Sequence, residues 1–327
     1  MRRTAILGTG AYAPERVLTN ADLEKMVETS DQWITERTGI KERRIAAPGE
    51  LTSDMAVKAA VRALEMAHTR AEELDLIVMG TVSPDMPMPS CAVAVQAKLG
   101  AKRAFAFDVS AACAGSLYAM SIADQYIRSG SARRALIVGA ELLSRVVDWT
   151  DRNTCVLFGD AAGAMVLGPS EDPDRGILGI HLHSDGDAAG ILTIRGGGSQ
   201  FPQSPEVLEK KLNKVSMNGR EVYRYAVRAL PDAVLEALGA QGLAADDVTH
   251  LIGHQANLRI IESVCDRLGL PLEKCWVNIH RFGNTSSASL PTTLDEANRA
   301  GRLRKGDIIA MMAIGAGMAW GAGVVRW

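Results

Sequence analysis

The stretch FDVSAACAGSLYAMSIADQYIRSG, residues 107–130, places one thiol between two kinds of local structure. Its first residues end an apolar run that is typical of a buried strand, and its later residues predict a long helix that begins with small side chains. Cys113 lies at the junction. The stretch therefore predicts a strand, a turn and a buried helix, with the sulfur just before the first turn of the helix.

Segments on both sides continue this alternation. Residues 56–67 and 91–100 are expected to form helices, whereas 74–82, 104–109 and 134–141 are expected to form buried strands. Strands that alternate with helices pack as layers, and continuous apolar strands are typical of parallel sheets. We therefore predict an α/β layer fold with mainly parallel strands.

The second half of the chain repeats the order of the first. Similar segments recur about 170 residues apart, which is close to one domain length: TAILGTG near residue 4 with GILGIHL near 176, AEELDLIV (71–78) with ADDVTHLI (245–252), AFAFDV (104–109) with CWVNI (275–279), and ALIVGAE (135–141) with DIIAMMA (307–313). A constant offset over several elements indicates an internal duplication. We predict two like halves, residues 1–172 and 173–327, joined near the turn-rich GPSEDPDRG (168–176).

Composition and charge argue against several classes of protein. The chain has 327 residues, of which 47% are apolar, and its net charge of −2 is unlike that of a general nucleic-acid binder. No apolar run approaches the ~20 residues of a membrane span, and the N-terminal MRRTAILGTGAYAP is interpreted as a strand and turn rather than a signal peptide. The five cysteines form neither a CxxC pair nor a Cys/His metal pattern, so we expect reduced thiols in a cytoplasmic protein.

Three polar residues follow strands or precede helices. Cys113 and Asn284 are expected at equivalent places in the two halves, and His254 follows the strand in LIGHQANLR. Ligands of α/β sheets gather at the carboxyl ends of strands, and a helix N-terminus there is expected to lower the pKa of a thiol. The alternative is a packed core cysteine, because free cysteine is among the most buried residue types.

These residue types suit thioester chemistry. A nucleophilic thiol needs a nearby group such as His to raise its thiolate fraction. An enolate formed next to a thioester needs fixed donors, and an imidazole Nε2–H and an Asn amide are suitable. Papain-like hydrolases also use Cys, His and Asn, so the residue types alone leave a hydrolase open.

Six blocks of sequence, spread nearly from end to end, carry a family resemblance. The blocks are TNADLEKMVETSDQWITERTGIKERRIA (19–46), DVSAACAGSLYAMSIADQYI (108–127), DRNTCVLFGDAAGAMVL (151–167), GHQANLRII (253–261), RFGNTSSASLPTTLDEA (281–297) and GAGMAWGAGVVRW (315–327). In these blocks the chain resembles β-ketoacyl-[acyl-carrier-protein] synthase III, the condensing enzyme that starts fatty acid synthesis within the thiolase-like superfamily. The resemblance implies a thiolase-like fold in which two duplicated α/β halves form αβαβα layers.

The resemblance implies a role for each of the three residues. Cys113 would take an acyl group from an acyl-CoA, and His254 and Asn284 would bind the thioester carbonyl of malonyl-[acyl-carrier protein]. Loss of CO2 would then give an enolate that attacks the acyl carbon, so neither a metal nor another cofactor is needed. The backbone N–H groups of Cys113 and Ala316 would form a second oxyanion hole. The family usually has glycine in place of Ala316, and alanine keeps that role only if the backbone angles suit it.

The resemblance also implies substrate and partner contacts. Trp33 and Arg152 would stack on the adenine of CoA, and Arg37 would contact the phosphates. The pantetheine tunnel would be lined by Thr29, Gly219, Tyr223, Ala256 and Asn257, with Tyr223 where members often have Phe. Arg259 would dock the acidic acyl carrier protein, although a solvated helix arginine is the alternative.

Met88 stands where many members have Phe, in a segment that the family lends to the acyl pocket of the other subunit. We therefore expect a homodimer and a pocket that tolerates primers larger than acetyl, because Met deforms readily.

Other functions within reach of the same residues stay open at this point. A secondary-metabolite condensing or acyl-transferring enzyme of the same family would use the same three residues with a non-acetyl primer. A thiolase would need a second cysteine near the C-terminus, which IGAGMAWG lacks. A non-catalytic scaffold that binds the carrier protein would not need the Cys, His and Asn set. We expect neither a nucleic-acid partner nor a membrane partner.

Overall fold

The computed structural model describes residues 3–327, and their strands form two main sheets. The first sheet has the order β1 (Thr4–Tyr12), β7 (Ala161–Pro169), β6 (Ala135–Glu141), β4 (Leu76–Gly80) and β5 (Phe105–Val109). The second has the order β8 (Gly176–Ser184), β13 (Ala319–Arg326), β12 (Ile308–Gly315) and β11 (His250–Gly253). The two orders correspond strand by strand, as the duplication predicts, while the division into domains at residue 172 stays a prediction.

The fifth strand of the second half is missing from this correspondence. Segment 275–279 forms a single bridge, Leu251 with Cys275, so the strand expected at CWVNI is wrong. The Gln255 side chain takes the place of a strand partner, because its amide donates to the Trp276 carbonyl (3.0 Å) and its oxygen accepts from the Asn278 N–H (3.1 Å). A side chain therefore satisfies backbone groups that a ladder would otherwise pair.

The expectation of mainly parallel strands is also wrong. Only β4–β5, β4–β6 and β11–β12 run parallel, whereas β1–β7, β6–β7, β12–β13 and β13–β8 run antiparallel. The reason is local, since β12 and β13 are joined by three residues, and so short a connection links only antiparallel strands. The second half thus ends with two strands that no helix separates, whereas in the first half residues 142–160, which contain a 3-10 turn and the short helix α6 (Arg152–Cys155), connect β6 and β7.

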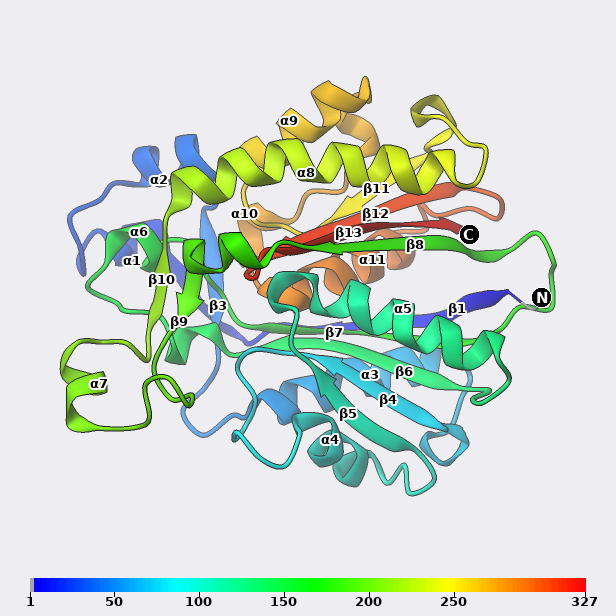
Figure 1. Cartoon of the computed structure of the whole chain (residues 1–327), viewed down its shortest axis with the longest axis horizontal. Coiled ribbons are helices and arrows are strands. Elements are labelled where there is room, and N and C mark those ends of the chain that lie inside the picture. Colours follow the sequence, from blue (N-terminus) through cyan, green and yellow to red (C-terminus); the bar gives the residue numbers. More distant parts are fainter. Residues whose placement is uncertain (1–2) are drawn as a thin grey trace.

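Helices complete the expected αβαβα layers (Figure 1). The outer helices are α3 (Thr52–Met66) and α4 (Cys91–Leu99) on the first sheet and α8 (Gly219–Gly239) and α9 (Leu258–Leu268) on the second, while α5 (Gly115–Arg128) and α11 (Ser289–Arg299) lie between the sheets. The small residues that begin α5 let it approach the sheet closely, because a Cβ on Gly80 would lie 2.5 Å from the Gly115 carbonyl carbon.

The remaining short elements gather mostly at one end of the layers, on the left of Figure 1. They are β2 (Arg16–Thr19), β3 (Glu42–Ile45), β9 (Leu192–Ile194), β10 (Val215–Met217), α1 (Asn20–Leu23), α2 (Asp31–Thr38), α6 (Arg152–Cys155), α7 (Pro205–Glu209) and α10 (Ile279–Phe282). Across residues 3–327, no helix joins the length and the apolar character that crossing a membrane requires.

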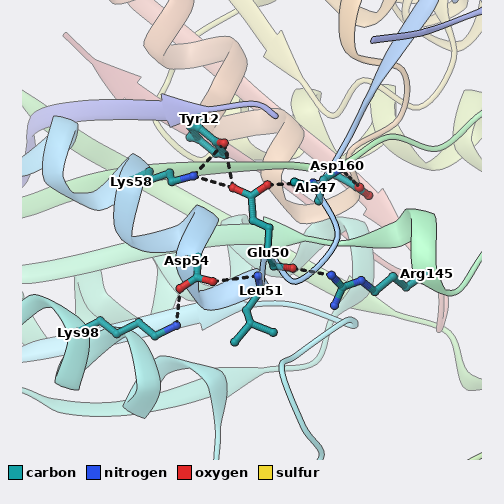
Figure 2. A network of polar contacts seen from close by, with 10 residues as sticks. Tyr12, Ala47, Glu50, Leu51, Asp54, Lys58, Lys98, Arg145 and Asp160 are labelled. Carbon is teal, nitrogen blue, oxygen red and sulfur yellow. Dashed lines mark hydrogen bonds and ion pairs between the residues drawn. The ribbon is translucent and has the colours of Figure 1, made fainter. Parts of the chain in front are cut away.

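A polar network fixes the loop between β3 and α3 (Figure 2). The Glu50 carboxylate accepts hydrogen bonds from Lys58 Nζ (2.7 Å) and Tyr12 Oη (2.9 Å), and the Glu50 carbonyl accepts one from Arg145 Nη2 (2.6 Å). Asp160 holds the start of the same loop through the Ala46 N–H (2.8 Å). Because Arg145 lines a cavity beside Cys113, this network supports one wall of that cavity.

Candidate active site

Cys113, His254 and Asn284 line one cavity of about 880 Å³. Each is nearly buried, with exposed fractions of 6%, 6% and 7%. Cys113 follows β5, His254 follows β11 directly, and Asn284 precedes α11. The structure thus brings together a thiol, an imidazole and an amide that are far apart in sequence.

A tight turn presents the thiol. Cys113 lies in a short 3-10 helix, 112–114, and Ala112 before it has a φ of 44°, in the left-handed region. Gly315 packs directly on this turn, since a Cβ there would lie 2.4 Å from the Cys113 nitrogen. A glycine at residue 315 is therefore required for the turn to keep its place.

The environment of the sulfur favours the neutral thiol. Burial, with a smaller contribution from the nearby Glu141 carboxylate, raises the pKa of Cys113 to about 12, although the Ser286 side chain acts in the opposite direction. The expectation that the helix N-terminus lowers the pKa of this thiol is therefore wrong for this structure. Loss of water around a charge outweighs the partial charge of a helix end.

The imidazole is also neutral, and its outer nitrogen is free to act. Burial lowers the pKa of His254 to about 3. Nδ1 lies 2.5 Å from Ser289 Oγ, and Ser289 Oγ accepts the Gln255 N–H (3.2 Å). The single Ser289 hydroxyl proton can form a hydrogen bond to Nδ1 or to the Ser286 carbonyl (2.9 Å); when it is donated to Nδ1, Nε2 carries the ring hydrogen and is the donor. Nε2 has no hydrogen-bond partner among residues 3–327, so it remains available to a ligand.

The Asn284 amide is oriented by its neighbours. Its backbone N–H donates to the Leu157 carbonyl (2.8 Å), and its carbonyl accepts from the Gly159 N–H (3.0 Å). Its Oδ1 accepts from the Ser286 N–H (2.8 Å), which leaves Nδ2 as the donor. Sequence reasoning missed Ser286, Ser289 and Glu141, although the serines stand inside the quoted block 281–297.

A second cavity of about 790 Å³ meets the first at Cys113, which lines both. Its wall includes Ala316, Phe158 and Met86. Ala316 is not among the residues with positive φ, so its backbone conformation suits alanine. Met88 is 84% exposed and lines neither cavity of its own chain.

Comparisons with known proteins cover both halves of the chain. Sequence profiles of 3-oxoacyl-[acyl-carrier-protein (ACP)] synthase III match residues 107–186, and those of its C-terminal part match residues 238–327. The chain is 52% identical over 322 residues to the β-ketoacyl-[acyl-carrier-protein] synthase III of Caldanaerobacter subterraneus, which covers 98% of this chain and 97% of the relative. This chain belongs to the β-ketoacyl-[acyl-carrier-protein] synthase III family.

Solved structures agree with this family. The 3-oxoacyl-[acyl-carrier-protein] synthase III of Aquifex aeolicus has a TM-score of 0.92 and 47% identity over 99% of this chain and 100% of that chain. The priming β-ketosynthase of the R1128 polyketide pathway has the same TM-score at 38% identity, covering 99% and 96%. The predicted thiolase-like fold is confirmed, and family membership makes the chain an acyltransferase of the condensing-enzyme class.

The three residues that the family resemblance relates to the nucleotide lie together, although Arg152 does not itself line the first cavity. The Arg37 guanidinium lies 4.8 Å and that of Arg152 5.1 Å from the ring centroid of Trp33. Arg152 Nη1 also donates to the Glu28 carbonyl (2.9 Å). Trp33 and Arg37 line the cavity, so planar groups surround its opening.

Of the five residues that the family resemblance relates to the pantetheine tunnel, four line the first cavity and one does not. Gly219, Tyr223, Ala256 and Asn257 line the first cavity. Thr29 is not among its lining residues, and the Thr29 hydroxyl is buried without a hydrogen-bond partner within residues 3–327.

Asn257 also serves the fold, and Arg259 lies beside it at the cavity opening. The Asn257 side chain accepts from the Arg259 N–H (2.9 Å), which caps α9, and donates to the Arg37 carbonyl (3.0 Å). Arg259 is exposed, lines the same cavity and has its guanidinium 5.8 Å from the Tyr223 ring centroid.

Proposed function

We propose that this chain starts fatty acid synthesis by a two-step acyl transfer centred on Cys113. An acyl-CoA would acylate the thiol, and the acyl-enzyme would condense with malonyl-[acyl-carrier protein] to give 3-oxoacyl-[acyl-carrier protein], CO2 and CoA. The observation that carries the proposal is the position of Cys113 between two cavities, with His254 and Asn284 beside it in the first.

In the first step the Cys113 sulfur attacks the acyl carbon of the CoA thioester. A sulfur–carbon bond forms to Cys113, the bond to the CoA sulfur breaks, and the thiol proton balances the departing CoA thiolate. The backbone N–H groups of Cys113 and Ala316 would stabilise the tetrahedral oxyanion, which the ordinary φ of Ala316 supports.

In the second step His254 Nε2–H and Asn284 Nδ2–H would bind the thioester oxygen of the malonyl group. Both are neutral donors whose other polar atoms are already engaged, so they are oriented before the substrate binds. Departure of CO2 leaves an enolate, which attacks the acyl carbon and expels the Cys113 sulfur as a thiolate, and a proton from solvent then restores the thiol. The carbanion comes from decarboxylation, so the chemistry requires no metal or redox cofactor.

The opening of the first cavity would receive the nucleotide of CoA. Adenine would replace the Arg152 guanidinium on the Trp33 face and stack between the two, with Arg37 at the phosphates. The pantetheine would run past Gly219, Tyr223, Ala256 and Asn257, which line the cavity. A contact with Thr29, which does not line it, would need a shift of that residue. Arg259, exposed at the same opening, would dock the acidic carrier protein.

A second copy of the chain would complete the acyl pocket. Met88 is 84% exposed, as expected of a residue that serves another subunit in a homodimer. Rates over a ladder of acyl-CoA primers test the size of that pocket, and strict preference for acetyl-CoA contradicts the proposal that it tolerates longer primers. We place the protein in the cytoplasm, where its substrates and reduced thiols occur.

Intact-mass measurement tests the central step. Incubation with an acyl-CoA should raise the mass by one acyl group, and the gain should be absent in Cys113→Ala. Addition of malonyl-[acyl-carrier protein] should then remove the adduct and yield 3-oxoacyl-[acyl-carrier protein]. The proposal fails if no acyl-CoA gives an adduct on the wild-type chain.

A further inference from the structure

Glu141 is a fully buried carboxylate, 0% exposed, at the end of β6. Across residues 3–327 no cation pairs with it, and it lines neither cavity. Five donors surround it instead, three from the loop after β4 and two from the second half of the chain: Thr81 Oγ1 (3.2 Å), Val82 N (3.1 Å) and Ser83 Oγ (2.6 Å) on Oε2, and Ser286 Oγ (3.0 Å) and Ser287 Oγ (2.9 Å) on Oε1.

Ser286, one of the serines that Glu141 binds, is linked to each of the three groups of the active site. The Ser286 N–H holds Asn284 Oδ1 (2.8 Å). Ser289 Oγ, the hydroxyl that contacts His254 Nδ1, also lies 2.9 Å from the Ser286 carbonyl. Ser286 also lines the second cavity together with Cys113. A small shift of Ser286 would therefore move the donors that face the substrate.

The backbone of Ser286 would not keep its place unaided. Its φ of 50° lies in the left-handed region, which non-glycine residues occupy only when their surroundings hold them there. The strand that carries Glu141 also packs closely against this turn, since a Cβ on Gly139 would lie 2.1 Å from the Ser287 carbonyl oxygen.

A carboxylate suits position 141, among five hydrogen-bond donors, for a chemical reason. Burial raises the pKa of Glu141, and the hydrogen bonds from its neighbours lower it. In its ionised form the carboxylate only accepts hydrogen bonds, so hydroxyl groups from both halves of the chain can direct protons to it, although Ser287 Oγ also lies 2.8 Å from the Gly80 carbonyl. A buried carboxylate without a cation is costly, and a purely structural tie could use a neutral group. The cost suggests that the exact placement of the serines matters to the reaction.

We propose that Glu141 is a positioning residue for the condensation. From the first half of the chain, Glu141 holds Ser286 and Ser287 of the second half and thereby orients the Asn284 amide toward the substrate carbonyl. The proposal rests on the decarboxylative function proposed above. It assigns to Glu141 no contact with substrate and no proton transfer.

The test compares Glu141→Gln with Asp124→Asn. Asp124 is a matched control because it is also a buried carboxylate in the first half, 3% exposed, and its ion pair is with Arg128 on α5, outside both cavities. Glu141→Gln should slow CO2 release from malonyl-[acyl-carrier protein] roughly 10- to 100-fold, the scale of a misplaced reacting group. The acylation rate of Glu141→Gln should fall less than its decarboxylation rate, because the turn at 112–114 holds Cys113. Its KM for acyl-CoA should stay within about twofold of the wild-type value, because Trp33 and Arg37 lie at the cavity opening.

A double variant tests whether Glu141 acts through Ser286. If Glu141 acts through Ser286, Glu141→Gln should add little to the decarboxylation defect of Ser286→Ala, so the double variant should match the slower single variant. Should Glu141→Gln fail to fold, Ser286→Ala with Ser287→Ala removes the same two contacts from the other side, and the same loss of decarboxylation is expected.

Several outcomes overturn the proposal. One is a wild-type decarboxylation rate in Glu141→Gln or in the double serine variant. Another is a loss of decarboxylation rate in Glu141→Gln no greater than that in Asp124→Asn. A third is a decarboxylation defect in the Glu141→Gln, Ser286→Ala double variant that equals the product of the two single defects. A wild-type chain that neither takes an acyl group nor releases CO2 would instead refute the proposed function.

Discussion

The turn that carries Cys113 and the turn that follows Asn284 are two versions of one device. Each is a 3-10 helix of three residues, 112–114 and 286–288, that leads directly into a central helix, α5 or α11. Each starts on a non-glycine residue with positive φ, Ala112 at 44° and Ser286 at 50°. The duplicated fold thus builds the same strained turn twice and aims both at one cavity.

The difference between the turns lies in which side chain they present. The turns align with an offset that places Cys113 opposite Ser287, not opposite Asn284, so the expected equivalence of Cys113 and Asn284 is wrong by three residues. Cys113 lines both cavities, whereas the Ser287 hydroxyl is buried against the Gly80 carbonyl (2.8 Å) and Glu141. One turn supplies the nucleophile, and its copy became a support for the amide that precedes it.

The largest expected effects are losses of different reaction steps: acylation depends on Cys113, and decarboxylation depends on Asn284 and His254. Asn284→Ala and His254→Ala should still take up an acyl group but decarboxylate malonyl thioester roughly 10²- to 10³-fold more slowly, because each removes one oxyanion donor. Cys113→Ala should show no acylation. Mass spectrometry and CO2 release measure the two steps, and normal decarboxylation in either donor variant would contradict the assigned roles.

A smaller effect concerns the strand end that packs on the Cys113 turn. Gly315→Ala should displace the turn, because the added Cβ would lie 2.4 Å from the Cys113 nitrogen. We expect acylation to fall roughly 10²-fold and stability to fall by about 1–3 kcal/mol. Ala316→Gly, one residue away, is the control and should change acylation by less than about threefold, since Ala316 has no positive φ. Equal behaviour of the two variants would show that the contact is unimportant.

Acid stability should reveal the buried imidazole of the second half. The pKa of His254 is about 3 in the folded chain against an ordinary value of 6.5, so the unfolded chain binds a proton first as the pH falls. This group should therefore cost about 2 kcal/mol of stability between pH 7.5 and 5. Denaturant unfolding of His254→Asn should lack that part of the loss. A pH dependence identical to that of the wild type would mean that His254 is not held neutral.

The smallest expected effect compares the strained residues themselves. Ala112→Gly relieves a left-handed φ and loses only a methyl group, so its stability should lie within about 1 kcal/mol of the wild type. Ser286→Gly relieves the same strain but loses the Glu141 contact, and should be less stable than Ala112→Gly. Thermal unfolding measures both, and the reverse order would show that Glu141 does not stabilise the second turn.

Several features could be predicted from the sequence because they depend on local pattern. The strand–helix alternation, the duplication and the blocks around Cys113, His254 and Asn284 predicted an α/β fold of this family, which the comparisons confirm. The antiparallel strands could not be predicted, because direction depends on whether a helix or three residues connect two apolar runs. The raised pKa of Cys113 depends on burial by distant segments. Glu141 ended an ordinary apolar strand, and only the packing of the two halves places the serines on it.

The meeting of two cavities at one sulfur has a kinetic consequence. An acyl chain held in the second cavity leaves the first free once CoA departs, so the carrier-protein arm would use the passage that CoA has just vacated. The two substrates would then alternate rather than bind together. Initial rates should give parallel lines in double-reciprocal plots, the ping-pong pattern, with free CoA competing against malonyl-[acyl-carrier protein].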